Sequence, residues 1–165
     1  MIEALRAEFS DVSDPAQITR IVVRLLLAAV LGGALGYERE RSGKAAGVRT
    51  HMLVAIGAAL FVLVPQQGGM VIGDMSRVIQ GIVTGVGFLG AGAIIKHPSA
   101  ESVHGLTTAA GVWMTAAIGI SCGLGREATA VLSTVLALVV LTLMPRLLGK
   151  SEDADRDLPK LGEER

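Results

Sequence analysis

The side chains best suited to chemistry gather in one charged stretch, residues 37–51, with the sequence YERERSGKAAGVRTH. This stretch places carboxylates beside basic side chains at the end of one apolar run and directly before the next. Arg49 falls where the second run begins, and a cation at a helix N-terminus opposes the helix dipole. We therefore predict that Arg49 pairs with Glu38 or Glu40. The alternative is an interfacial charge belt whose members pair with one another and with lipid headgroups.

The same stretch is a poor candidate for a metal site. Mg²⁺ and Ca²⁺ prefer a cage of oxygen ligands, whereas here two acids lie beside four basic residues, namely Arg39, Arg41, Lys44 and Arg49. We predict no metal site and no cofactor.

A second polar group is expected at the opposite membrane face. Arg24 lies near the entry of the first apolar run, and Arg77 and Gln80 lie near the entry of the third. Neighbouring cations repel unless an acid or an anionic ligand intervenes. We therefore predict an outer-face polar cluster of Arg24, Arg77 and Gln80, neutralised by Asp14, by Asp74 or by a bound anion.

No side chain has the sequence context of a catalytic nucleophile. Ser121 and Ser133 lie in apolar runs without a histidine, and the H-E-x-x-H, G-x-S-x-G and phosphate-binding-loop patterns are missing. His51, His97 and His104 fall on one predicted side of the membrane, where they are either solvated or form a proton-sensing cluster. We predict that the protein is not an enzyme.

Residues 77–97 contain an unusual glycine-rich run with no charge between Arg77 and Lys96. At about 1.5 Å per residue, such a run can cross a hydrocarbon core of about 30 Å as one helix. Its G-x-G-x-x-G spacing lacks the preceding strand that a dinucleotide site requires. Small residues let neighbouring helices approach closely, so we predict the central helix of a bundle. Its packing or pore-lining residues would be Gly81, Gly85, Gly87, Gly90 and Gly92.

The composition indicates a membrane protein. Hydrophobic residues make up 51% of the 165 residues, the mean hydropathy is +0.57, and charged residues are 18%, below the usual share of about 25%. The formal net charge is zero, so no bulk basic field attracts nucleic acid. We expect the lipid bilayer to surround the chain and expect no nucleic-acid partner.

Five apolar runs predict an all-α, polytopic membrane helix bundle with about five transmembrane helices, at residues 18–37, 52–64, 77–97, 106–124 and 128–144. Pro65 and Pro145 are expected to end the second and the last helix. Residues 1–15 would form an extracytoplasmic segment, residues 16–148 the membrane domain, and residues 149–165 a disordered acidic cytoplasmic tail. The small pairs Gly32/Gly36 and Gly119/Gly123 are expected to join subunits of a homo-oligomer.

The distribution of basic residues predicts the orientation. The side that holds residues 37–51 carries twice as many Lys and Arg residues as the other side. The positive-inside rule then places the N-terminus outside and the C-terminus in the cytoplasm.

Three blocks, at residues 36–61, 77–95 and 103–119, resemble the MgtC/SapB membrane proteins in content and order. The resemblance implies a bacterial inner-membrane protein of several helices, from a family in which some members are linked to growth in low magnesium and to survival inside host phagocytes. It also implies a regulatory role, restraint of the F-type ATP synthase, instead of magnesium pumping. The motif residues that it carries over are Glu38, Arg39, Arg49, Thr50, His51, Gly85, Gly87, Gly90, Gly92, Thr107 and Thr108.

Two functions are therefore considered. The first is a non-enzymatic integral membrane protein that regulates a membrane or cytoplasmic partner, such as the ATP synthase, in connection with magnesium limitation or membrane energetics. The second is a small oligomeric transporter or channel for an ion such as Mg²⁺, and a water-filled path beside residues 85–92 would favour it. The short tail replaces the soluble C-terminal domain of longer virulence members, so we expect the core fold alone.

Overall fold

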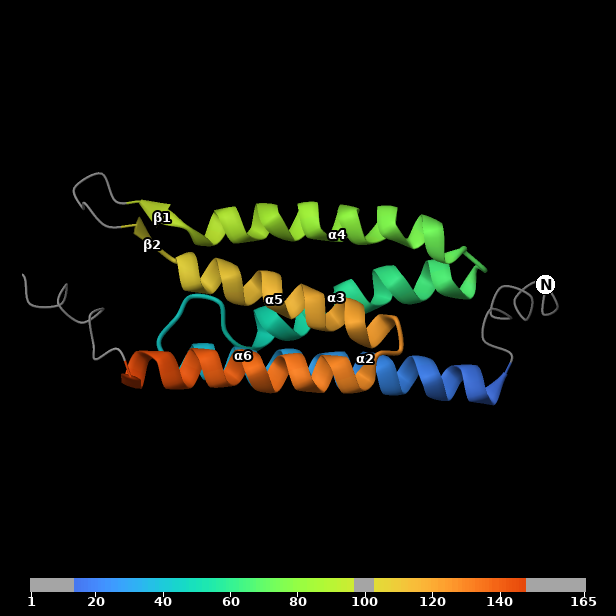
Figure 1. Ribbon diagram of the computed structural model, residues 1–165, viewed down its shortest axis with the longest axis horizontal. Coiled ribbons are helices and arrows are strands. Elements are labelled where there is room, and N and C mark those ends of the chain that lie inside the picture. Colours follow the sequence, from blue (N-terminus) through green and yellow to red (C-terminus); the bar gives the residue numbers. More distant parts are fainter. Residues whose placement is uncertain (1–13, 97–102, 148–165) are drawn as a thin grey trace, which may run out of the picture.

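The computed structural model describes residues 14–96 and 103–147, which form a bundle of helices (Figure 1). The helices are α2 (Pro15–Arg41), α3 (Val48–Gln67), α4 (Ile72–Ala93), α5 (Leu106–Gly123) and α6 (Glu127–Leu147). Between α4 and α5, the short strands β1 (Ile95–Lys96) and β2 (Val103–His104) pair antiparallel. The predicted all-α bundle is confirmed, whereas the predicted tail and most of the predicted N-terminal segment lie outside the described residues.

The outer surface of the bundle is apolar. Within the described residues, four helices are long and apolar enough to cross a membrane, namely α2, α3, α5 and α6 as far as Pro145. Large side chains such as Leu132 and Phe88 point outward, with exposed fractions of 70% and 80%. So much exposed apolar area would be unfavourable in water but suits contact with lipid acyl chains. The chain is a membrane helix bundle.

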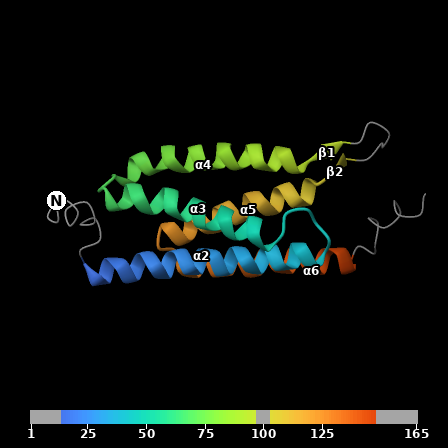
Figure 2. The same ribbon diagram turned by 180° about the vertical axis from the view of Figure 1, so that it is seen from behind.

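The centre of the bundle is α5, which packs against each of the other four helices. The prediction that the glycine-rich third run is central is wrong. Its helix, α4, contacts α5 and, less extensively, α3, and it runs along the edge of the bundle in both ribbon views (Figures 1 and 2). Both helices are rich in small residues, and composition alone does not distinguish the buried one from the peripheral one.

Glycines on α2 and α5 bring those helices into contact with the backbone of α3. A Cβ atom at Gly36 of α2 would lie 2.6 Å from the Cα atom of Val48, and one at Gly123 of α5 would lie 2.6 Å from the carbonyl oxygen of Ala59. Gly32 and Gly119 are equally crowded by α3. The expectation that these pairs join two subunits is therefore wrong, because they already pack within the chain.

Four predicted helix boundaries also differ from the structure. Pro65 and Pro145 lie inside the last turns of α3 and α6 instead of ending them, where a missing N–H costs only one backbone hydrogen bond. The third helix starts at Ile72 and stops at Ala93, short of the predicted end at His97. The chain then enters β1, and α5 begins after Gly105, whose φ of +90° favours glycine.

The connections gather at two ends of the bundle. At one end lie the loop of residues 42–47, the strand pair and the C-terminal end of α6 (Figure 1). We call this the loop end, and it is the side predicted to face the cytoplasm. At the other end lie Asp14, which caps α2, and the connections from α3 to α4 and from α5 to α6.

Candidate functional site

The loop of residues 42–47 is held tightly at both of its ends. Backbone N–H groups of Ser42, Gly43 and Lys44 each donate 3.0 Å hydrogen bonds to the last carbonyls of α2. On the other side, the Glu40 carboxylate accepts a 2.9 Å hydrogen bond from the Val48 N–H at the start of α3. Since the N-cap residue Gly47 has no side chain, Glu40 supplies the capping acceptor from the preceding helix. This arrangement fixes α2 and α3 relative to each other.

A buried ion pair lies beneath this loop. Arg39 is only 3% exposed, and its Nε donates to the carboxylate of Glu38. The other oxygen of Glu38 accepts a 2.9 Å hydrogen bond from the Ser42 hydroxyl. A buried charge is tolerated when it is paired and hydrogen-bonded, and both conditions are met here.

His51 completes this group from the first turn of α3. Its side chain is fully buried, and its Nδ1 lies 3.0 Å from the carbonyl oxygen of Gly47. If Nδ1–H donates to that carbonyl, the neutral ring presents Nε2 as an acceptor. Nε2 has no hydrogen-bond partner among the described residues. In that tautomer, the His51 Nε2 is a buried hydrogen-bond acceptor that no described residue satisfies.

Helix α5 closes the group from the third side. A Cβ atom at Gly111 would lie 3.6 Å from the His51 Nε2 and 4.0 Å from the Arg39 Cδ. Thr108, one turn earlier on α5, is also buried. Glu38, Arg39 and His51, which we call the ionic centre, thus join the ends of α2 and α3 against α5.

The remaining predicted motif residues at the loop end lie outside the ionic centre. Arg49, Thr50 and Thr107 are exposed. The predicted pairing of Arg49 with Glu38 or Glu40 is wrong, because no ion pair joins them within the described part of the chain. Both acceptors are already engaged, one by Arg39 and Ser42 and the other by the N-terminus of α3.

The predicted outer-face cluster is not assembled either. Arg24 instead donates to the Gln66 side chain at 2.9 Å and to the Gly123 carbonyl at 3.0 Å, and its Nε lies 3.8 Å from the Glu127 carboxylate. These contacts, which we call the Arg24 clasp, tie α2 to the ends of α3 and α5 and to the start of α6. A cation at the C-terminal end of α5 also complements the helix dipole.

Neither of the other two members of the predicted cluster is among the polar partners of Arg24 in the described part of the chain. Arg77 is 84% exposed and faces Asp74, one turn back on α4, at 3.9 Å. Gln80 is exposed as well. Sequence reasoning missed Gln66, which is far from Arg24 in sequence, although Glu127 in the first turn of α6 was a visible acidic signal.

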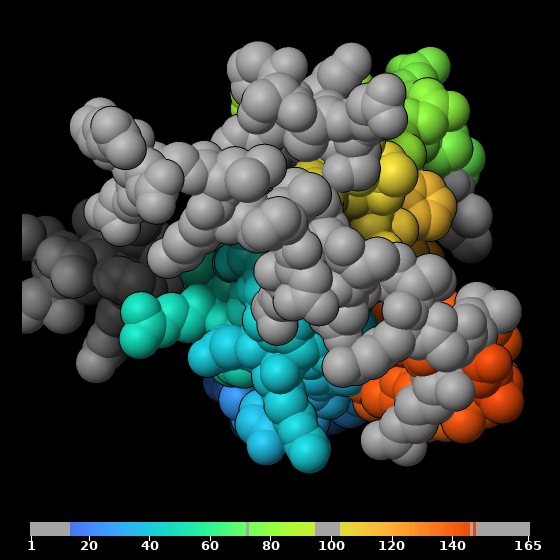
Figure 3. All heavy atoms as spheres, turned by 90° about the vertical axis from the view of Figure 1, so that its left-hand side faces the viewer, coloured from blue at the N-terminus to red at the C-terminus, as the bar shows by residue number. Residues whose placement is uncertain are grey.

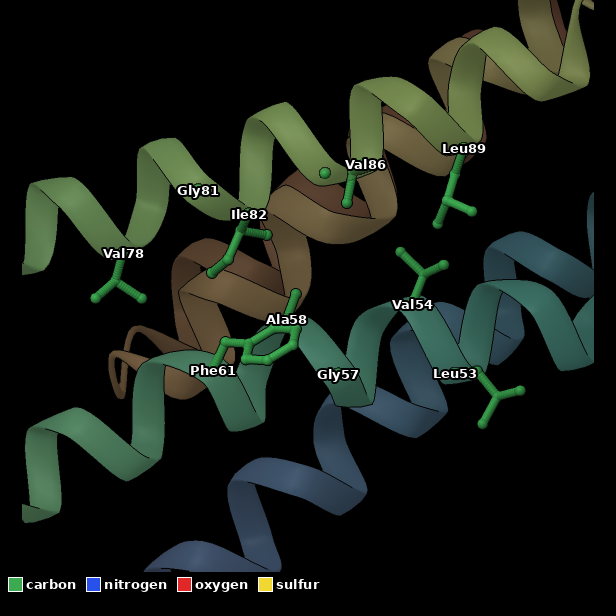
Figure 4. Close-up of a pocket in the computed structure, with 11 residues that line it drawn as sticks. Leu53, Val54, Gly57, Ala58, Phe61, Val78, Gly81, Ile82, Val86 and Leu89 are labelled. Carbon is green, nitrogen blue, oxygen red and sulfur yellow. The ribbon is translucent and has the colours of Figure 1, made fainter.

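Two glycines of α4, Gly81 and Gly85, border an open groove of about 610 Å³ between α3 and α4 (Figure 4). Its walls carry no charged side chain and are formed by Leu53, Val54, Gly57, Ala58, Phe61, Val78, Gly81, Ile82, Gly85, Val86 and Leu89. Among the predicted packing glycines, only Gly90 has a neighbour, the Ala109 Cβ at 3.6 Å; Gly81, Gly85, Gly87 and Gly92 face open space. Packing of these four glycines, or a pore beside them, therefore stays a prediction that involves a second subunit.

No metal site is formed within the described residues. No group of three or more His, Cys, Asp or Glu side chains there lies close enough to hold a metal ion. The groove between α3 and α4 offers only apolar side chains to an ion.

Comparisons with known proteins agree on one family. A model of the MgtC family matches residues 25–149. Protein SrpB of Synechococcus elongatus is 44% identical over 135 residues, which are 75% of this chain and 74% of SrpB. YhiD of Escherichia coli K12, whose name describes a proposed magnesium transporter, is 43% identical over 76% of this chain.

Protein MgtC of Brucella abortus is 45% identical over 73% of the chain. The chain spans 61% of the length of YhiD and 50% of the length of the Brucella protein. No solved structure matches the chain.

Proposed function

The chain belongs to the MgtC family, and from that premise we propose that it is a non-enzymatic membrane regulator whose loop end contacts a partner protein. The observation that carries the proposal is the ionic centre beneath an exposed charged surface. The regulated process would be linked to magnesium limitation or membrane energetics. The protein would lie in the bacterial inner membrane with its N-terminus outside and the loop end in the cytoplasm.

The ionic centre suits positioning better than transport. Its one buried cation, Arg39, already neutralises Glu38, the one acid that it contains. A divalent cation that entered here would meet Arg39 and would have to displace it from Glu38. Repulsion between like charges is strong where water is scarce, so the centre disfavours Mg²⁺.

The loop end offers a surface suited to protein recognition. Arg41, Arg49 and Thr50 are exposed there, beside the capping residue Glu40. The view onto this end shows the cyan segment that contains the loop at the surface, next to the red end of α6 (Figure 3). Because the ionic centre fixes the ends of α2 and α3, these side chains project from a rigid base, which lowers the entropy cost of binding.

The second candidate is an oligomeric transporter or channel. Two observations favour it: the name of YhiD, and the groove beside the open glycines of α4. A second copy that covers α4 could close this groove into a path lined by backbone groups. The apolar lining offers a cation no side-chain ligand, so we place this function second.

The family resemblance names the F-type ATP synthase as a partner to test. The protein would be reconstituted with that enzyme in liposomes, and ATP-driven proton pumping would be followed by quenching of a pH-sensitive dye. We expect the protein to slow pumping and the charge reversal Arg49→Glu to relieve the inhibition. Reversing an exposed charge at an interface weakens association mainly through electrostatic mismatch.

The matched control is Arg77→Glu, which reverses an arginine that is also exposed but lies at the opposite end of the bundle. It should leave the inhibition intact. Unchanged pumping with folded wild-type protein would rule out restraint of the ATP synthase. Equal relief by both variants would show that the loop end is not the contact surface.

A further inference from the structure

A second groove lies on the lipid-facing side of the bundle, between α2 and α6 close to the loop end. Both helices end at the loop end and run beside each other (Figures 1 and 2). Their facing sides leave a space of about 640 Å³. On α2 the lining residues Ala34, Tyr37 and Arg41 follow one helical face at steps of three and four. Leu138 and Leu141 line it from α6 in the same way.

The groove changes from apolar to polar along its length. Ala34 lies in its deeper part, and Arg41 lies seven residues further along α2, about 10 Å nearer the helix end at the usual rise. Leu138 and Leu141 supply the apolar wall. Tyr37 lies between the two levels and is exposed, as tyrosines at a membrane–water interface commonly are.

Among the described residues that line the polar end, Arg41 carries the one charge that no neighbour engages, and this charge is positive. The Glu38 carboxylate, which also borders the groove, is engaged by Arg39 and Ser42. The Thr142 hydroxyl donates to the Leu138 carbonyl at 2.7 Å. Arg41 is exposed, and it forms no hydrogen bond or ion pair with another described residue. An anionic group that enters the groove would therefore meet the Arg41 guanidinium.

The end of α2 would ordinarily disfavour an anion, because helix C-termini carry partial negative charge. Here the last carbonyls of α2 accept hydrogen bonds from the backbone of Ser42, Gly43 and Lys44. These contacts satisfy the carbonyls, and Arg41 supplies a full positive charge beside them. Among the described residues that line the groove mouth, Arg41 is thus the group that can attract a phosphate.

We propose that this groove binds one phospholipid, with its phosphodiester at Arg41 and an acyl chain against Leu138 and Leu141. The positions of the polar and the apolar part of the groove indicate the class of ligand. A phosphate at the helix end and an apolar chain directed toward the bilayer centre match the orientation of a membrane lipid. Neither a free phosphate nor a second apolar helix would use both parts of the groove.

The proposal is tested by native mass spectrometry of the purified full chain in micelles titrated with dioleoyl-phosphatidylglycerol. The wild-type protein should retain one tightly held lipid. Arg41→Gln should raise the dissociation constant of that lipid roughly tenfold, the loss expected for one charge-assisted hydrogen bond. The control Arg49→Gln removes an exposed arginine of the same end outside the groove and should leave the constant unchanged.

A second variant tests the apolar part without changing the charge. Ala34→Phe fills the deep end of the groove, and it should abolish retention of the lipid while Arg41 stays in place. Glycerol phosphate, which has the headgroup without acyl chains, should not bind to the wild-type protein. Thermal unfolding of each variant in the same detergent confirms that it is folded.

Three results would overturn the proposal. The first is equal lipid retention by the wild-type protein, Arg41→Gln and Ala34→Phe. The second is an equal loss with Arg49→Gln, which would indicate only general attraction of lipid to a basic surface. The third is a dimer that Ala34→Phe dissociates, which would show that a second copy occupies the groove. None of these results depends on whether the loop end contacts a partner protein.

Discussion

Helix α3 has two sides with different surroundings. On the side of α2 and α5, glycines bring the helix backbones into contact. The ionic centre joins these helices at the loop end, and the Arg24 clasp joins them at the other end. On the side of α4, an apolar groove of about 610 Å³ separates the helices. The first side, which we call the close side, specifies its contacts within one chain. The second, the open side, leaves its glycines without neighbours.

The contrast shows that glycine has two roles in this protein. On the close side it allows helices to touch, and on the open side it lines a free surface. Gly119 is conformationally ordinary, but α3 leaves no room there for a methyl group. Gly85 lies in an equally regular helix and has free space around it. Substitutions on the close side should therefore lower the free energy of unfolding. Substitutions on the open side should instead change the binding of any molecule that covers α4.

The largest effect should come from the ionic centre. Arg39→Leu removes the buried cation and leaves Glu38, which is partly exposed and keeps its bond to Ser42, without its ion-pair partner. We expect a loss of about 3 kcal/mol, the lower end of the range for a broken buried pair. The free energy of unfolding would be measured by denaturant titration in mixed micelles. Arg49→Leu, which removes an exposed arginine near the same loop, should change it by less than about 0.5 kcal/mol. Similar losses from both variants would contradict the distinction between a buried and an exposed arginine.

A pair of single-methyl substitutions compares the two sides directly. Gly119→Ala forces a Cβ atom against the Ala55 backbone of α3, and overpacking of this kind costs about 1–3 kcal/mol. Gly85→Ala adds the same methyl group to open space and should leave the melting temperature in detergent unchanged or slightly higher, because alanine favours the helix. A drop in melting temperature with Gly85→Ala in the monomer would mean that α4 is packed more closely than the groove implies.

The smallest effect should come from the Arg24 clasp. The hydrogen bond between Arg24 and Gln66 lies at a partly exposed position, so its coupling energy should be about 1 kcal/mol. A double-mutant cycle with Arg24→Met and Gln66→Leu measures this energy separately from the Gly123 contact. If the changes in the free energy of unfolding from the two substitutions are strictly additive, the bond between Arg24 and Gln66 does not contribute to the clasp.

Much of the fold could be predicted from sequence because apolar runs of sufficient length have few alternatives in a membrane. Which helix lies at the centre could not be predicted in this way. Glycine content made the third run and α5 look equally suited to close packing, and α5 is central because Gly119 and Gly123 face α3. That choice depends on which helical faces meet, and no local pattern records it.

The charged stretch stays a candidate site, and the structure differs from its predicted pairing. The charged stretch was recognised from its density, and His51 and Arg39 do lie together within it. The partner of Glu38 is its sequence neighbour Arg39, and Glu40 caps the next helix. The helix dipole alone favours an acceptor for Arg49, but several arginines compete for the same carboxylates, and Glu38 and Glu40 already have other partners.

The most direct test of the regulatory assignment is a measurement of Mg²⁺ flux and, separately, H⁺ flux through purified protein in liposomes. A regulator that presents its loop end to a partner should give no flux above that of empty liposomes. The variant Gly85→Leu, which fills the groove between α3 and α4, should behave in the same way. Flux through the wild-type protein that Gly85→Leu abolishes would contradict the assignment and place an ion path beside α4.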